Sequence, residues 1–385
     1  GGAANFNLCM GQQEKEEAAS FAGNAITMLF SLGMILCIIT RLFLKPMMIL
    51  FGATSSVLDY SLIYTGITSL GFPFLILTTG GTNLVRADGS PKFSMTCTLT
   101  GAIINTILDP TLIFGFHMGI AGAAWATVIG QVVSGIMVIL YLRKFKTVKL
   151  TKEKLRPHSH YIGRIVSLGM APFFNQVSMM VVQIVMNNIL RHYGAESVYG
   201  SDIPIACAGI ISKVNQVFMA ICIGISQGSQ PIWGFNYGAK KYSRVRQTYR
   251  CSVTLCTIIA MIFFICFQFF PHQIVGIFGN GNDLYFQFAE KYLRIFMLMT
   301  FANGIQPMSA GFFTSIGKAK LGIIMSLTRQ VLFLLPLIVI FPLFLGIDGV
   351  MYAGPIADTS AFVLAVVFAR KELGIMKSME SDQEI

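Results

Sequence analysis

Gly119-Ile120-Ala121-Gly122 begins the stretch 119–142, GIAGAAWATVIGQVVSGIMVILYL, which contains no charged side chain. Each residue of an α-helix rises about 1.5 Å, so about 20 apolar residues cross the hydrocarbon core of a membrane. The stretch therefore predicts a transmembrane helix. A closely similar opening returns as Gly346-Ile347-Asp348-Gly349, at the start of a second apolar stretch, 347–369.

The rest of the chain is also rich in apolar residues and poor in charged ones. Of its 385 residues, 54% are apolar and only 12% are charged, whereas soluble domains carry roughly 25% charged residues. This composition excludes a soluble enzyme, a disordered chain and a secreted disulfide scaffold. Short alternating segments typical of a β-barrel do not occur, so we predict an all-α polytopic membrane protein. Its ten predicted spans are 21–44, 57–84, 93–116, 119–142, 161–190, 203–235, 251–270, 285–315, 321–345 and 347–369.

An internal repeat with an offset of 227 or 228 residues runs through these spans. A constant offset that persists through many short matches indicates a duplicated structural unit. The further matches are Gly11 with Gly238, Ala87-Asp88-Gly89-Ser90-Pro91-Lys92 with Ser315-Ile316-Gly317-Lys318-Ala319-Lys320, and Arg143-Lys144 with Arg370-Lys371.

The repeat predicts how the chain is organised. Six spans follow residue 160, so the unit is a six-helix lobe, and an even number of helices makes the two lobes parallel. We predict an N-terminal lobe at 1–142, a basic cytoplasmic linker at 143–160, a C-terminal lobe at 161–372 and a cytoplasmic tail at 373–385. The first lobe contains four complete spans and the end of a fifth. We therefore expect a twelve-helix protein whose first helix and most of whose second precede Gly1.

The net charge of +11 reflects topology. Of the 28 Lys and Arg, seven lie in 143–156 and five in 240–250, and smaller groups lie in the other connections on the same side of the membrane. Positive residues favour the cytoplasmic side, so we predict a cytoplasmic C-terminus and no nucleic-acid partner. The eight Cys have no metal-binding spacing, so we expect neither a disulfide framework nor a resident metal.

The most informative polar motif is Asn105-x-x-x-Asp109-Pro110 in the span 93–116. Positions i and i+4 share one face of a helix, and a charge inside a membrane is a functional candidate by default. Thr127 of the next span supplies a further oxygen. Hard oxygen ligands suit Na⁺, and a carboxylate in a low dielectric also holds a proton. The counterparts in the other lobe are apolar or small: Leu332 or Phe333, Pro336 or Leu337, and Gly354 or Pro355.

Other polar residues within the spans have open roles. Lys213, Arg294, Arg329 and Asp358 are the remaining intramembrane charges, and they are candidates for gating, substrate binding or ion pairing. Four amides of the C-terminal lobe are candidates for a substrate cavity, with interhelical hydrogen bonding as the alternative. They are Asn175, Gln183, Asn215 and Gln306.

Several of these segments resemble a known family. Residues 225–239, ISQGSQPIWGFNYGA, resemble a signature of the MATE (multidrug and toxic compound extrusion) transporters, and so do 86–92, RADGSPK, and 119–127, GIAGAAWAT. The resemblance implies a twelve-helix export pump driven by a Na⁺ or H⁺ gradient. In bacterial members, residues matching Asn105, Asp109 and Thr127 bind the cation together with an Asp of the first helix. That helix is not part of this chain, so one expected carboxylate is missing.

We therefore expect a secondary-active exporter of amphipathic, often cationic, compounds, working in the cell membrane as a monomer surrounded by lipid. It would need no cofactor besides Na⁺ or H⁺. The alternative within transport is a lipid-linked oligosaccharide flippase of the same superfamily. A membrane-embedded enzyme acting on lipid phosphates is disfavoured, because it needs acidic Mg²⁺-binding clusters and the one cluster, Glu14, Glu16 and Glu17, is interrupted by Lys15.

Overall fold

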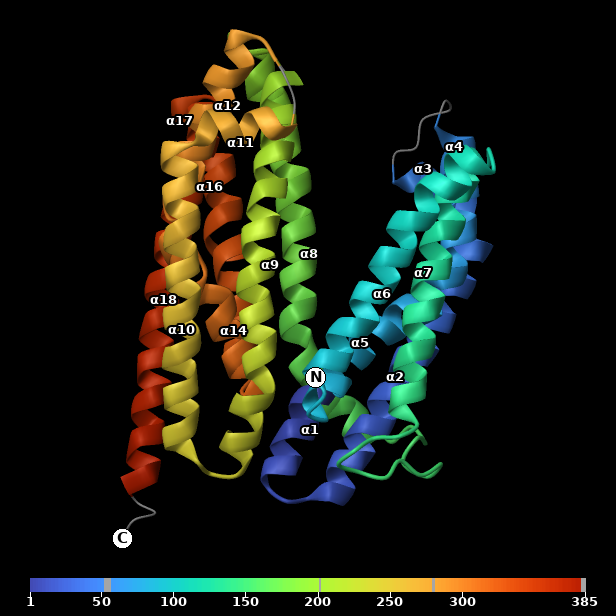
Figure 1. Ribbon diagram of the computed structural model, residues 1–385. Coiled ribbons are helices and arrows are strands. Elements are labelled where there is room, and N and C mark those ends of the chain that lie inside the picture. Colours follow the sequence, from blue (N-terminus) through green and yellow to red (C-terminus); the bar gives the residue numbers. More distant parts are fainter. Residues whose placement is uncertain (52–56, 201, 279–280, 382–385) are drawn as a thin grey trace. The chain divides into compact units, whose positions relative to one another are not determined.

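The computed structural model describes residues 1–51, 57–200, 202–278 and 281–381, and these residues form helices and turns without a strand (Figure 1). The chain divides into two compact units, which we call the first unit (Gly2–Val166) and the second unit (Ser167–Ile385 together with Gly1). The predicted all-helical class is confirmed.

The first unit begins with the short helix α1 and is built mainly from long helices. Proline at the start of α5 and of α6 fits because the first turn of a helix leaves its N–H groups without intrahelical partners. The elements are α1 (Gly2–Gly11), α2 (Lys15–Leu42), α3 (Leu44–Leu50), α4 (Leu58–Thr68), η1 (Ser69–Gly71), α5 (Phe72–Ala87), α6 (Pro91–Pro110), the π-helical η2 (Thr111–Gly115) and α7 (Gly119–Leu142).

The second unit begins within α8, after Val166. Its core is rich in aromatic rings, and Trp233, Tyr249 and Phe312 pack against one another. Its elements are α8 (Ser159–Ala195), α9 (Asp202–Gly238), α10 (Tyr242–Phe269), α11 (Pro271–Phe278), α12 (Asp283–Phe296), α13 (Thr300–Asn303), α14 (Ile305–Ser315), α15 (Ala319–Leu327), the π-helical η3 (Thr328–Leu334), α16 (Leu335–Ile340), α17 (Pro342–Leu345) and α18 (Asp348–Ser381).

Nine helical segments of the described residues are long and apolar enough to cross a membrane. The sequence predicts ten, and the difference is the span 285–315, which is not one continuous helix. It consists of α12, α13 and α14, interrupted after Phe296 and again at Gly304. Pro307 explains the second break, because its ring lacks an N–H and crowds the carbonyl of Asn303 four residues earlier.

The backbone repeats together with the sequence. Turn residues with positive φ occur at equivalent places in the two halves: Gln13 and Lys240, Gly89 and Gly317, and Gly119 and Gly346. The last pair has φ of 54° and 58°, a left-handed conformation that glycine adopts without steric cost. The stretch quoted first therefore begins with a turn whose geometry needs its glycine.

Residues 143–158 pack on the first unit. The backbone oxygen of Lys154 accepts a hydrogen bond from Asn24 of α2, and the Asn24 side chain accepts one from the backbone of His158. Lys154 also pairs with Glu16 at 2.8 Å. The boundary between the two units falls after Val166, inside α8. At the other end, the predicted tail is helical as far as Ser381, and 382–385 lie outside the described residues.

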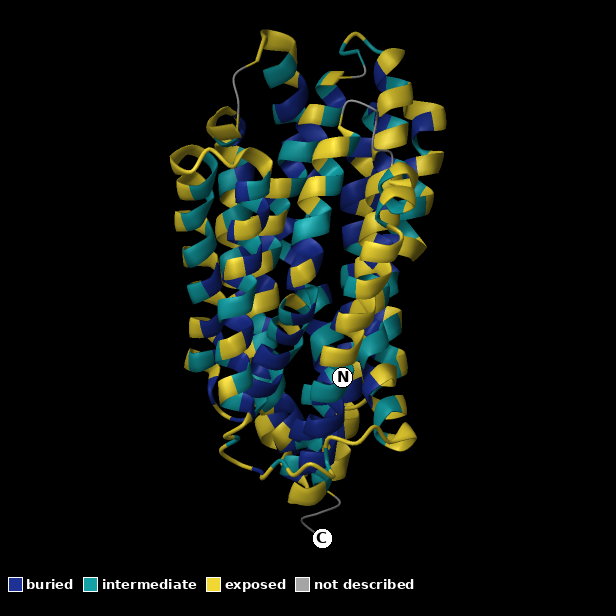
Figure 2. Cartoon of the chain, turned by 90° about the vertical axis from the view of Figure 1, so that its right-hand side faces the viewer, coloured by how far each residue is buried: buried dark blue, intermediate teal, exposed yellow. Residues whose placement is uncertain are grey.

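Apolar side chains cover much of the outside of both units. Leu42 and Phe269 are both 72% exposed, and in Figure 2 exposed residues run along the whole length of the helices. Lipid tails provide the surroundings that such surfaces require. The helices therefore have the surface of membrane-spanning segments.

The helices α6 and α7 touch backbone to backbone where Gly101 meets Gly130. A Cβ at Gly130 would lie 2.7 Å from the carbonyl oxygen of Gly101, which is closer than atoms normally approach. Close approach through small residues is the usual way in which membrane helices pack. This contact sets the distance between the two helices that carry Asn105, Asp109 and Thr127.

Substituting Gly130 with Ala is expected to push α6 and α7 apart and to lower the thermal midpoint of the detergent-solubilised protein by roughly 4 °C. Gly169→Ala is the matched control, because Gly169 is also helical but has no atom within 4 Å of its added Cβ among the described residues. Its midpoint should stay unchanged or rise slightly, since Ala is the better helix former. Equal midpoints for the two variants would contradict the close contact.

Candidate ion-binding site

Asn105, Asp109 and Thr127 come together in the first unit. The Asn105 amide nitrogen lies 3.4 Å from Oδ1 of Asp109, one helical turn away on α6. The same nitrogen lies 3.3 Å from the hydroxyl of Thr127 on α7. All three side chains are half-buried. The structure therefore brings together the three residues that the sequence singles out.

Local backbone geometry positions these side chains. Pro110 ends the regular part of α6 because it has no N–H to donate, and the π-helical η2 follows at once. Gly122 of α7 holds η2 close, since a Cβ there would lie 2.8 Å from the carbonyl carbon of Leu112. The carboxylate of Asp109 thus stands at the junction between an ordinary and a widened helix, a place where π-helical turns are often functional.

The donor set matches a small hard cation. Asp109 offers two carboxylate oxygens, Thr127 offers a hydroxyl, and Asn105 offers an amide. The Thr127 hydroxyl donates to the carbonyl of Ala123 at 3.0 Å, which leaves its lone pairs for other partners. Turning the Asn105 amide by about 180° exchanges its nitrogen for its oxygen, so the group can face either a carboxylate or a cation. Na⁺ and a proton both suit this arrangement.

The second unit contains a different buried polar group. Nε of Arg329 in η3 lies 2.5 Å from Oδ1 of Asp358 in α18, and the amide of Asn303 lies 3.3 Å from Oδ2. The sequence identifies Arg329 and Asp358 as intramembrane charges without a partner assignment. In the sequence Asn303 is only one of many amides, and its place at the break between α13 and α14 is not predicted.

The four predicted cavity amides lie in different surroundings. Gln183 is exposed and donates to Asn187 one turn along α8, and Asn175 of α8 contacts the sulfur of Met179. Gln306 is 6% exposed and donates to the carbonyl of Met325, so it joins α14 to α15 inside the unit. Asn215 of α9 has a buried side-chain oxygen without a hydrogen-bond partner among the described residues.

The other two intramembrane bases are both exposed. Lys213 lies on an exposed face of α9, and Arg294 lies near the end of α12, where its backbone oxygen accepts a hydrogen bond from Gln268. Neither belongs to an ion pair found among the described residues. The structure therefore separates these two bases from the Arg329–Asp358 pair.

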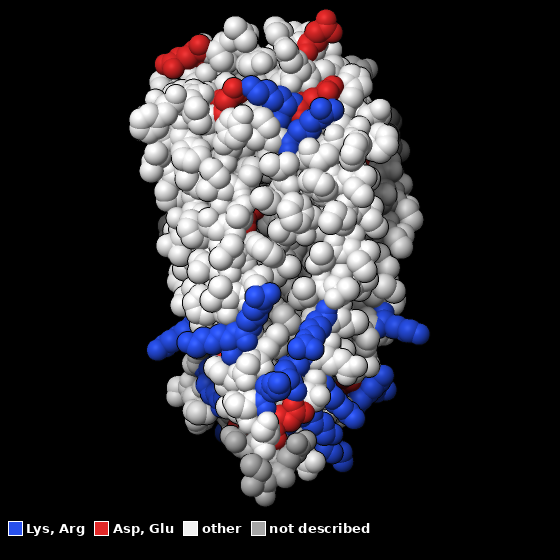
Figure 3. Space-filling model, turned by 90° about the vertical axis from the view of Figure 1, so that its left-hand side faces the viewer, with Lys and Arg blue, Asp and Glu red and all other residues white. Residues whose placement is uncertain are grey.

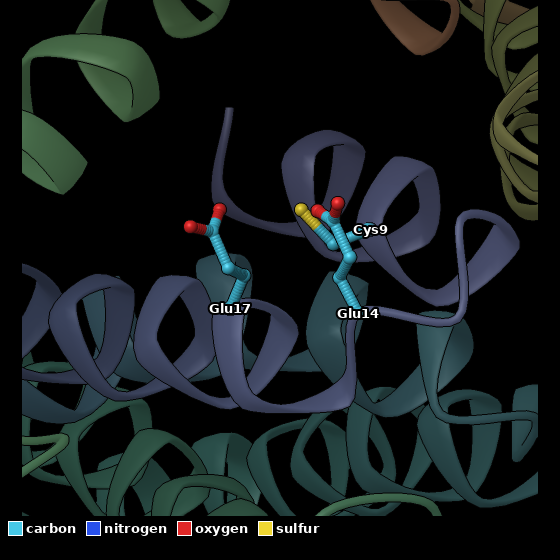
Figure 4. A group of neighbouring side chains, drawn as sticks. All are labelled: Cys9, Glu14 and Glu17. Atoms are coloured by element: carbon cyan, nitrogen blue, oxygen red, sulfur yellow. The ribbon is translucent and has the colours of Figure 1, made fainter.

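One further group of metal-ligating atoms lies at the turn from α1 to α2 (Figure 4). The thiol of Cys9 and the carboxylates of Glu14 and Glu17 have atoms within 4.8 Å of one another. Glu14 stands at the N-cap position of α2 without a side-chain capping hydrogen bond, and Glu17 lies in the first turn, where negative charge is stabilised by the helix dipole. The position of the two carboxylates is explained by this helix end, and we assign them no separate binding role.

The chain is similar to a family of known transporters. The family model MatE matches residues 8–111 and 171–340. Two curated relatives are named multidrug export protein MepA. The one from Staphylococcus haemolyticus is 29% identical over 95% of this chain and 79% of its own length, and the one from Staphylococcus saprophyticus is 29% identical over 90% and 76%.

Solved structures show the same fold. The MATE multidrug transporter DinF-BH, solved in a complex, matches with a TM-score of 0.86 and 33% identity over 96% of this chain and 82% of its own. An outward-facing MATE transporter of the MOP superfamily matches with a TM-score of 0.90 and 18% identity, over 98% and 83%. The predicted architecture is thus confirmed by structures of independent origin.

Proposed function

The chain belongs to the MatE family, and on that premise we propose that it exports amphipathic, often cationic, compounds in exchange for Na⁺ or H⁺. The MepA relatives are named for multidrug export and support an efflux role. The observation that carries the coupling proposal is the convergence of Asn105, Asp109 and Thr127 on one point between α6 and α7. We propose no organic cofactor and no catalytic residue.

The proposed cycle follows from competition for Asp109. A carboxylate inside a membrane is costly as a bare charge, so in each state of the cycle it holds a cation, a proton or a positively charged substrate. An inward ion gradient loads Asp109 from outside, and binding of substrate from inside releases the ion. Alternating access then links the two events, as in other repeat-built transporters. Exposed amides of α8, above all Gln183, are the proposed substrate contacts, with Asn175 and Asn215 as further candidates.

The orientation proposal rests on the basic residues. On the face of the second unit shown in Figure 3, Lys and Arg gather toward the lower end, and few lie at mid-height. The basic segments 240–250 and 370–377 belong to this unit. Positive charge prefers the cytoplasm, so we propose that this end, with the C-terminus, is cytoplasmic and that the protein resides in the cell membrane.

Dye efflux from cells that express the full-length protein tests the proposal. The Na⁺ gradient and the H⁺ gradient are collapsed separately with ion-selective ionophores, while the expression level is held constant. Efflux should stop when the coupling gradient is removed and continue when the other is removed. Efflux that needs neither gradient, or no efflux of any amphipathic dye, would contradict the exporter and favour the flippase.

A further inference from the structure

The long helix α18 is fastened to the second unit by four ion pairs. Each of its acidic residues up to Ser381 meets a base from a different segment: α12, η3, the turn before α15, and α10. The pairs are Asp348–Lys291 at 2.7 Å, Asp358–Arg329 at 2.5 Å, Glu372–Lys318 at 2.6 Å, and Glu380–Arg246. The equivalent helix of the first unit, α7, contains no acidic residue.

The Asp358–Arg329 pair is the one embedded in the unit. The side chains of Asp358 and Arg329 are 2% and 7% exposed, whereas those of Asp348 and Lys291 are 37% and 40% exposed. Both oxygens of Asp358 are satisfied, one by Arg329 and the other by Asn303. A buried ion pair of this kind is costly to break from one side, because the remaining charge has no water to solvate it.

Both units thus contain an amide beside a carboxylate, but in different surroundings. In the first unit, Asn105 and Asp109 are half-buried, and no base among the described residues pairs with the carboxylate. In the second unit, Asn303 and Asp358 are buried, and the guanidinium of Arg329 is hydrogen-bonded to the carboxylate. In the internal repeat, Asp358 corresponds to Gln131, and Arg329 corresponds to Gly101 or Ala102. The first unit therefore carries no charge at either position.

We propose that Arg329 is the fixed cation of the second unit, meaning a permanently charged side chain that neutralises Asp358. Its guanidinium takes the position on Asp358 that a proton or Na⁺ would otherwise take, so Asp358 does not exchange ions during transport. Removing Arg329 alone converts Asp358 into a new cation-binding group. The absence of ion exchange at Asp358 during transport rests on the proposed function. The neutralisation of Asp358 by Arg329 does not.

Neighbouring charges do not replace Arg329. Arg329 and Asn303 are the charged and amide groups that contact Asp358. The other bases that face α18 from the segments packed on it, Arg246, Lys291 and Lys318, are each held by another acid. Asp358 in an Arg329→Gln variant therefore has to acquire a proton or a metal cation from solution.

Thermal unfolding of the detergent-solubilised full-length protein tests this without any transport measurement. Arg329→Gln should lower the thermal midpoint at pH 8 by roughly 10 °C. Lowering the pH to about 5.5 should restore at least half of the loss, because protonation neutralises Asp358. Raising Na⁺ against choline at pH 8 distinguishes Na⁺ binding from proton uptake. A low midpoint that responds to neither pH nor Na⁺ would overturn the proposal.

Companion variants keep the test decisive if Arg329→Gln does not fold. Arg329→Lys keeps a fixed cation and should resemble the parent protein at both pH values. Arg329→Gln combined with Asp358→Asn removes both charges, and its midpoint should lie above that of Arg329→Gln and should not respond to pH. A double variant as impaired as the single one would show that charge is not the cause. Lys291→Gln, at the exposed pair, is the matched control and should change little.

Transport by the same double variant tests the second part. It should retain gradient-driven efflux with the ion dependence of the parent protein. Loss of ion dependence in the double variant, with efflux preserved, would show that Asp358 takes part in coupling and would overturn the proposal. If the parent protein itself shows no efflux, the proposed function fails, while the thermal measurements still decide whether Arg329 is the fixed cation.

Discussion

Replacing Asp109 by Asn should reduce gradient-driven efflux to the level of cells that lack the transporter. The substitution preserves the size of the side chain and keeps an oxygen that can accept the hydrogen bond from Asn105. It removes the negative charge, which is the property that attracts Na⁺ or a proton. The expected defect is therefore in coupling and not in folding.

Efflux rate, membrane expression and thermal midpoint should be measured together for this variant. Asp59→Asn is the matched control, because Asp59 is an exposed aspartate of α4 in the same unit, and it should transport normally. Thr127→Ala removes one neutral oxygen and should reduce efflux partially. Normal gradient-driven efflux by Asp109→Asn would refute the proposed site, and a collapse of expression would assign Asp109 a structural role.

Asp88→Asn should give the largest loss of stability among single substitutions in the first unit. The Asp88 carboxylate is buried and accepts four hydrogen bonds. The donors are the backbone N–H groups of Lys146 and Thr147 and the hydroxyls of Thr147 and Tyr141. An Asn would turn its NH₂ group toward donors, at a cost of about 3 kcal/mol. The thermal midpoint should fall by roughly 10 °C.

Graded variants separate this network from general damage. Tyr141→Phe removes one of the four donors and should cause a smaller loss of about 1 kcal/mol. Asp59→Asn again serves as the control and should leave the midpoint within about 1 °C, because its side chain is exposed. If Asp88→Asn unfolded at the same temperature as the parent protein, the hydrogen-bonded contact between residues 88–90 and 146–147 would not stabilise the protein.

The parts of the fold that were predicted correctly depend on local chemistry. Long apolar stretches such as 119–142 predict spanning helices because each helix satisfies its own backbone hydrogen bonds in lipid. The i, i+4 spacing of Asn105 and Asp109 predicts one shared face, and the structure places Thr127 beside them. Glycines at equivalent turns, such as Gly119 and Gly346, agree with the duplication.

The features that could not be predicted depend on tertiary contacts. The span 285–315 has enough apolar residues to cross a membrane, yet the structure divides it into α12, α13 and α14, and Pro307 accounts for the break at Gly304. The partner of Asp358 could not be identified, because Arg329 and Asn303 reach it from 29 and 55 residues away in the sequence. Gln306 resembled the other amides, and only packing shows that it joins α14 to α15.

The ion pairs of α18 also determine an order of assembly. Arg246, Lys291, Lys318 and Arg329 are synthesised before the acids that neutralise them. Until α18 enters the membrane, Arg329 is a cation without its counter-ion, and such a charge is held at the membrane surface or shielded by water. The second unit therefore reaches its final packing only when α18 has been inserted.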